Sequence, residues 1–316
     1  MAEQRQITIT TEYFEREDVA HWLGGAVGGV ISEVNNIVDL SSLDGITISC
    51  NYPLSLKNLD RGFKTGVDLQ TSTGDVVGVA MTVPVLRDGM QKSHLVFNAD
   101  IVAAVAIPDS KDFDEAQRII IHECGHVVHK AALVKCFPDH FLNYRYKNIH
   151  ESLRCETWIA VIDEYYATRF SSLGYYEGLD MYESIVFDRI VKLSENISEY
   201  ISLYRYHSNI DQLLHEVYGE IATTMKFTGY YLGCADALCV DICKRNKYKE
   251  LSSYPFTKYI KKIRNACQNI YDKHGEWTDF SLMEKISDIL DEIAVENGVI
   301  VKETEDGNIY VDVPFK

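Results

Sequence analysis

The chain has 316 residues and 46% of them are hydrophobic, which is enough to build the core of one large domain or two smaller ones. Its formal net charge of −16, from 31 Lys and Arg against 47 Asp and Glu, argues against nucleic acid as a partner because phosphates would be repelled. Apolar segments such as residues 101–107 are far shorter than the roughly 20 residues that span a bilayer, so no membrane partner is expected.

The N-terminal residues and the cysteines both bear on location. Residues 1–18 are polar and acidic, without the basic and apolar regions of a secretory signal. The eight cysteines follow no regular pairing, which is typical of reduced thiols, so the sequence predicts a cytoplasmic protein. The spacing of Cys234, Cys239 and Cys243 does not fit a C-x-x-C metal knuckle, and we interpret them as free thiols.

The first part of the chain predicts two strands on either side of a helix. Residues 7–14 and 46–52 are rich in β-branched and aromatic types, which favours strands, and residues 54–66 predict a loop. Residues 17–38 carry apolar side chains at intervals of three and four, which predicts an amphipathic helix. Four glycines weaken this helix, so we expect them to serve close packing against a neighbour.

A hairpin is the clearest prediction of sheet structure. Residues 76–86 and 94–106 are two β-prone runs, and between them Asp88-Gly89 is a strong turn pair. Pro84 lacks a backbone N–H, so its strand is expected to be interrupted or to lie at an edge.

The rest of the chain is predominantly helical. Asp and Ser residues at 109–114 are suited to capping a helix that begins at Glu115, and a second helix is predicted over residues 151–171. Helices continue to residue 298, with breaks expected near Gly174, Gly178, Ser208, Gly233, Tyr254 and Gly275. The tail predicts a hairpin that turns at Asp306-Gly307.

The predicted fold class is therefore α+β. We expect a small mixed sheet with the helix from Glu115, then a large all-helical C-terminal half and a terminal β-hairpin. The predicted domains are residues 1–173 and residues 174–316.

The helix from Glu115 contains the motif around which the chain is organised. His122, Glu123 and His126 form the H-E-x-x-H pattern, in which two histidines one helical turn apart can share one zinc ion. Glu123 lies beside them, where it can act on a water molecule at that ion. The sequence therefore predicts one catalytic Zn²⁺ with His122 and His126 as ligands and Glu123 as the catalytic base.

Two histidines leave a catalytic zinc site incomplete, because such sites take three protein ligands. The metzincin pattern places a third histidine six positions after the second, but that position is Ala132. His129 lies two turns from His122, about 10 Å along the axis, which is too far for both to reach one ion. The remaining source is a carboxylate on the later helix, where Glu156, Asp163 and Glu164 are the candidates.

The later helix carries a resemblance. Glu164 with Ala167 resembles the E-x-x-A pattern of gluzincins, the thermolysin-like zinc metallopeptidases, and E-x-x-A-T-R-F is similar to the glutamate helix of the ImmA/IrrE family. The H-E-C-G-H run resembles the H-E-L-G-H motif of that family. One departure is Thr168, where gluzincins often carry an acidic or amide side chain that orients a histidine.

The resemblance implies a minimal gluzincin core and a metallopeptidase acting on a peptide or a specific protein, with Glu164 as the third ligand. It also implies a later histidine or tyrosine that stabilises the oxyanion, for which the candidates are His207, His215, Tyr218 and Tyr230. The strand before the metal helix would be the edge along which substrate pairs, with residues 98–100 facing it. The alternative function is a non-catalytic, metal-binding interaction or sensor protein on the same fold.

Overall fold

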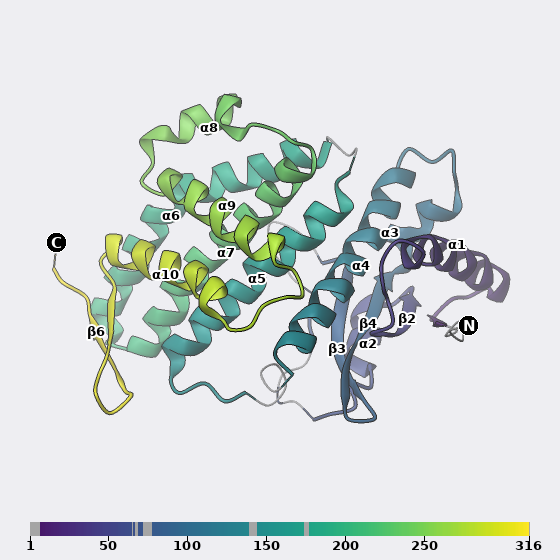
Figure 1. Cartoon of the computed structure of the whole chain (residues 1–316), viewed down its shortest axis with the longest axis horizontal. Coiled ribbons are helices and arrows are strands. Elements are labelled where there is room, and N and C mark those ends of the chain that lie inside the picture. The colour runs from purple at the N-terminus through teal and green to yellow at the C-terminus, as the bar shows by residue number, and fades with distance from the viewer. Residues whose placement is uncertain are drawn as a thin grey trace. The chain divides into compact units, whose positions relative to one another are not determined.

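The computed structural model describes residues 7–64, 66, 69–71, 78–138, 144–173 and 177–315, and its fold is α+β as predicted. The chain forms two compact units, Met1–Leu142 and Asn143–Lys316. The first unit contains a sheet and its helices, and the second is helical with a terminal hairpin (Figure 1). Among the described residues, every helix is too short or too polar to cross a membrane.

The first unit is built on a four-stranded mixed sheet in the order β1-β2-β4-β3. β2 runs parallel to both β1 and β4, whereas β3 and β4 form an antiparallel hairpin. Asp88 and Gly89 both adopt positive φ, at 52° and 75°, which is the backbone geometry of a tight two-residue hairpin turn. The strands are β1 (Thr8–Glu12), β2 (Leu43–Ser49), β3 (Ala80–Arg87) and β4 (Met90–Asn98).

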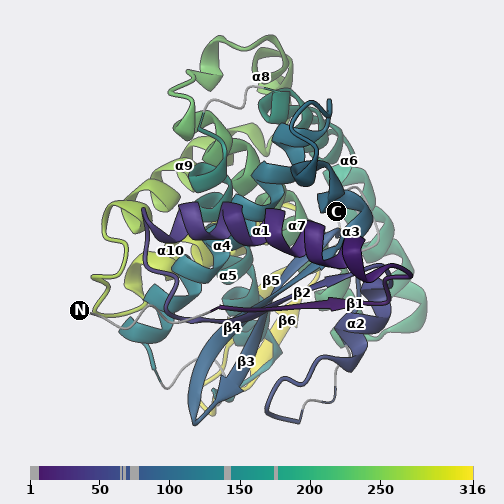
Figure 2. The ribbon, with the colours of Figure 1, turned by 90° about the vertical axis from the view of Figure 1, so that its right-hand side faces the viewer.

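Helices cover both faces of this sheet (Figure 2). α1 (Glu17–Asn35) packs with α4 (Phe113–Cys136) on one face, and α2 (Tyr52–Asn58) packs its Tyr52 and Leu56 on the other. Two of the four glycines of α1 serve close packing, because a Cβ at Gly28 would lie 2.8 Å from Ile9 Cδ1 and one at Gly24 would contact Thr11. Gly25 and Gly29 face open space.

Two predicted segments differ from the structure because asparagine side chains cap helices there. Residues 54–66 were expected to be a loop, yet Asn51 accepts a hydrogen bond from Leu54 N and Pro53 stands in the first turn of α2. The strand predicted over residues 94–106 ends at Asn98, whose side chain accepts from Asp100 N and caps α3 (Ala99–Val102). A 3₁₀ turn, η1 (Ala103–Ala106), follows. The predicted strand start at Val76 lies outside the described residues.

The second unit is a bundle in which α5 and α7 lie side by side (Figure 1). α6 packs against α7, and α10 packs against α5 and α9. Its long helices are α5 (Ile149–Ser171), α6 (Glu177–His207), α7 (Ile210–Ala237), α9 (Thr257–Asp272) and α10 (Ser281–Glu296). Short elements are η2 (Ile242–Lys244), α8 (Asn246–Glu250) and η3 (Leu251–Ser253), and β5 (Ile300–Glu303) pairs with β6 (Ile309–Asp312).

The two units divide at residue 142, whereas the sequence placed the domain boundary at residue 173, after α5. The reason is the close packing of α5 on α7 at two glycines one turn apart. A Cβ at Gly229 would lie 2.7 Å from Val161 O, and one at Gly233 would lie 2.5 Å from Tyr165 O. Side chains could not fit there, so α5 belongs with the helical unit.

The same packing explains one wrongly predicted helix break. Gly233 lies inside α7, where glycine serves packing rather than ending the helix. The break expected near Gly178 is confirmed, because α5 ends at Ser171 and α6 begins at Glu177. The breaks at Ser208 and Gly275 are confirmed, and both residues have positive φ, at 56° and 75°. The predicted break at Gly174 lies outside the described residues.

Candidate metal centre

The H-E-x-x-H residues lie on the buried side of α4. His122, Glu123 and His126 are 8%, 6% and 7% exposed, so all three polar side chains are buried. Burial of three such groups is costly unless they are bonded to one another, to a partner or to an ion. Among the described residues, they form the one group of three or more His, Cys, Asp or Glu whose potential ligand atoms lie within 4.8 Å of one another.

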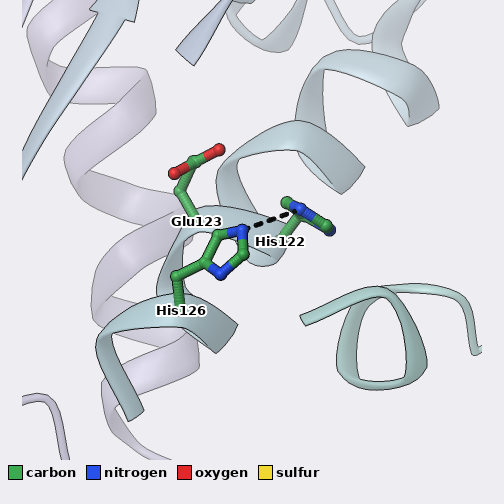
Figure 3. A group of neighbouring side chains, drawn as sticks. All are labelled: His122, Glu123 and His126. Carbon is green, nitrogen blue, oxygen red and sulfur yellow. Dashed lines mark hydrogen bonds between the residues drawn. The ribbon is translucent and has the colours of Figure 1, made fainter. Parts of the chain in front are cut away.

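The two histidines have the spacing that one tetrahedral ion needs. His122 Nε2 and His126 Nε2 lie 3.1 Å apart, and the two rings meet edge to face (Figure 3). Two nitrogens bound at about 2.05 Å with a tetrahedral angle are separated by about 3.3 Å. The pair of side chains therefore fits a shared zinc ion with little rearrangement.

Glu123 is held by a residue of the sheet. Thr82 Oγ1, on β3, donates a hydrogen bond of 2.6 Å to Glu123 Oε2 and lies 3.1 Å from the Glu123 backbone oxygen. Both side chains are buried, and Thr82 is the one hydrogen-bond donor to this carboxylate among the described residues. The bond fixes one carboxylate oxygen and leaves the other oxygen for chemistry.

The sequence did not single out Thr82, because its place beside Glu123 is set by the packing of β3 on α4 rather than by a local motif. Lys130 Nζ, two turns after Glu123, also donates to Thr82 O at 3.3 Å and strengthens this contact. A threonine in a β-prone run has no distinguishing signal in the sequence.

Two neighbours of Glu123 have raised pKa values. Burial and the charge of Glu123 raise the pKa of the Cys124 thiol far above its usual range. The same two causes raise the pKa of Tyr52, whose hydroxyl is buried.

The proposed third ligand belongs to the helical unit. Glu164 and Asp163 are half-buried on α5, and Glu156 on the same helix is exposed and accepts a hydrogen bond of 2.7 Å from Ser152. His129 is fully buried on α4 and is not part of the three-residue group. The joining of Glu164 to the two histidines at one ion stays a prediction.

Each candidate for the oxyanion donor has local partners within the helical unit. His207 Nδ1 lies 2.9 Å from Asn209 N, and His215 Nδ1 lies 2.8 Å from a backbone oxygen of its own helix. Tyr218 is buried and donates to Asp291 at 2.9 Å, while the Tyr230 ring stacks on neighbouring aromatic rings. The contacts of these four side chains are those of structural residues, and a role in catalysis stays a prediction.

β3 is one of the two edge strands of the sheet, with β1 as the other, whereas β4, the strand that precedes the metal helix, is not the edge strand that was predicted. β4 is bonded to β2 on one side and to β3 on the other; Asn98 pairs with Ser49 of β2, and residues 99–100 belong to α3. In an antiparallel pair, every second residue of a strand is hydrogen-bonded to the partner strand, and the residues between them direct their N–H and C=O groups away from it. Because Val79 O accepts from Asn98 N, the residues of β3 that direct their backbone groups outward are 80, 82 and 84. Pro84 therefore places its missing N–H on the edge, as expected of an edge strand.

Comparison of the chain with family models, with curated proteins and with solved structures finds no match in any of the three.

Proposed function

We propose that this protein is a zinc-dependent metallopeptidase of the gluzincin type that cleaves a peptide or a specific protein. The single observation that carries the proposal is the buried pair of histidine Nε2 atoms 3.1 Å apart with a carboxylate beside them. In this proposal His122, His126 and Glu164 are the ligands of one Zn²⁺, and Glu123 is the catalytic base.

The chemistry divides between the ion and the chain. A bound zinc would lower the pKa of a coordinated water towards about 7 and polarise the substrate carbonyl. Glu123 would take the proton from the attacking water and later pass it to the leaving amine. Thr82 keeps one oxygen of Glu123 in place at 2.6 Å, so that the other oxygen carries the proton. Burial of the site shields these charges from water and strengthens their interactions.

We expect an extended substrate to add to the edge of β3. Ala80 and Thr82 direct backbone groups outward, and because Thr82 O accepts from Lys130 Nζ at 3.3 Å, the groups offered to a substrate are those of Ala80 and the N–H of Thr82. Thr82 is also the residue whose hydroxyl contacts Glu123. A chain paired at this edge would bring a peptide bond close to the carboxylate. The edge around Leu86 is covered, because Leu86 N donates to Arg61 O at 2.8 Å, so pairing is expected at the start of β3.

The free thiols support a proposal for the location of the protein. All eight cysteines are free, including buried Cys124, Cys155, Cys234 and Cys267. Free thiols are typical of a reducing compartment, and we propose the cytoplasm.

Two variants test the reaction. Glu123→Gln keeps the shape of the side chain and should keep zinc while losing peptide cleavage, because an amide cannot accept the proton. His122→Ala should lose the metal, measured by elemental analysis of the purified protein. If Glu123→Gln cleaves a peptide library as fast as the parent, the proposed mechanism is wrong.

The same pair of variants separates the alternative function. A protein that holds one zinc, cleaves no peptide, and keeps its biological activity in the Glu123→Gln form would be a metal-binding interaction or sensor protein. A Glu123→Gln form that loses the metal would instead identify Glu123 as a ligand, a role that its place in the three-residue group also allows.

A further inference from the structure

The helical unit contains an open pocket of about 370 Å³ that the proposed peptidase site does not use. Its walls come from the end of α5, the end of α7, the segment that follows α7, and α9. This volume is at the lower end of the range for small-molecule sites. The charged side chains that line it are Arg169, Asp236, Asp241 and Arg264.

Three of these four charges are already compensated. Asp236 is 3% exposed and accepts hydrogen bonds from Arg264 on Oδ1 and from Gln268 and Tyr165 on Oδ2. Asp241, at the rim, is half exposed, with Lys244 Nζ 3.5 Å from its Oδ2. The Asp236 carboxylate therefore has hydrogen-bond donors on both of its oxygens, and the Asp241 carboxylate is paired with Lys244.

Arg169 is the remaining charge. Its Nη1 donates to the Tyr165 hydroxyl at 2.9 Å, and its guanidinium carbon lies 3.9 Å above the centre of the Tyr271 ring. No carboxylate pairs with it in the part of the chain that the structure describes. A guanidinium fixed by stacking and by one hydrogen bond still has N–H groups that can bind an oxyanion in a bidentate manner.

We propose that this pocket binds a small monocarboxylate, which Arg169 holds through its free N–H groups. The net charge of the lining explains the preference for one negative charge. Two arginines and two aspartates line the pocket, so a dianion such as phosphate would meet two carboxylates with only one uncompensated cation to hold it. Gln268 also lines the pocket, where its Nε2 donates to Asp236 at 3.0 Å. Its amide group is available for a second polar contact with the carboxylate.

Fluorine NMR with fluoroacetate and fluoroacetamide tests this proposal on the full chain. The carboxylate and the amide have nearly the same shape, so only the charge differs. We expect saturable line broadening with fluoroacetate and none with fluoroacetamide. Unlabelled acetate should displace the probe at lower concentration than inorganic phosphate does. Absence of saturable binding, or equal binding of the amide, would overturn the proposal.

Two variants locate the binding. Arg169→Gln should weaken fluoroacetate binding about tenfold or more, because a charged hydrogen-bonded pair is lost. Val240→Glu adds a negative charge to the pocket wall, and the backbone N–H of residue 240 still donates to Ala235 O. This variant should weaken fluoroacetate binding without affecting the contacts of Arg169. Unchanged binding in either folded variant would contradict the assignment.

Two controls exclude other sites. Arg16→Gln removes an exposed arginine of the first unit and should leave the affinity unchanged. Carboxylates also bind zinc, so His122→Ala should keep fluoroacetate binding if the pocket is the site. Loss of binding in His122→Ala would place the carboxylate at the metal centre and refute the pocket.

Discussion

Thr82→Val tests whether the sheet orients the carboxylate of the metal helix. Valine has nearly the shape of threonine but no hydroxyl, so the substitution removes the 2.6 Å bond to Glu123 Oε2 and adds no bulk. A hydrogen bond to a charged group contributes about 1.5–3 kcal/mol. Glu123 is 6% exposed, and water cannot easily replace the lost donor. We expect the free energy of opening of the β3–α4 region to fall by about 2 kcal/mol.

Thr228→Val is the matched control for this measurement. Thr228 is fully buried, and its hydroxyl donates to Thr224 O at 2.8 Å, a neutral bond within one helix. Such a bond contributes about 1 kcal/mol. Hydrogen exchange followed by mass spectrometry reports each region by itself, so Thr82→Val should speed exchange in β3 and α4, and Thr228→Val more weakly in α7.

Thr82→Val should lower kcat, whereas zinc binding should not change. A loss of 1.5–3 kcal/mol in the transition state corresponds to about a 10- to 150-fold lower kcat. Zinc content should stay unchanged, since Thr82 contacts neither histidine, and Thr82→Ser should keep most of the rate. A Thr82→Val protein with parental kcat and parental exchange in α4 would refute the positioning role.

Three further predictions concern the helical unit. Glu164→Gln should lower zinc affinity by at least about a hundredfold in competition with a chelating dye, whereas Glu156→Gln should not; equal affinities would exclude Glu164 as the ligand. Gly233→Ala, whose Cβ would lie 2.5 Å from a backbone oxygen of α5, should destabilise the unit in urea, while Gly219→Ala on the same helix meets nothing within 4 Å and should stabilise it by up to about 1 kcal/mol. Burial lowers the pKa of His274 from 6.5 to about 4, so between these pH values only the unfolded chain takes up a proton, and the parent should lose about 2 kcal/mol more stability than His274→Phe from pH 7 to pH 4.5.

Much of the fold follows from signals that are local in the sequence. Asp88-Gly89 gave the hairpin, and Pro84 indicated the edge strand. The missed helices had readable signals as well. Asn51 followed by Pro53 is a cap and a first-turn proline, and Asn98 precedes an alanine-rich run. Both helices are short, α2 with seven residues and α3 with four, and each directly follows a β-prone run, so the strand pattern outweighed these signals.

The domain boundary depended on information that is not local. Gly229 and Gly233 are spaced one turn apart on α7, which predicts a face that a neighbour approaches closely, but the sequence does not say which neighbour. The partner is α5, whose backbone oxygens at Val161 and Tyr165 lie against these glycines. Glycine in a helix therefore indicated packing rather than a break, as it did for Gly28 in α1.

The candidate metal centre combines both kinds of information. The spacing of His122 and His126 follows from the helical repeat alone, and the structure brings their Nε2 atoms together. The support of Glu123 depends on the register of the β3–β4 hairpin, in which Thr82 pairs with Leu95. Because side chains alternate between the two faces of a strand, a slip of one residue would turn Thr82 towards α2 and place an apolar side chain against Glu123. The two-residue turn at Asp88-Gly89 fixes that register, so a turn with no contact to the metal ligands determines how the proposed catalytic base is held.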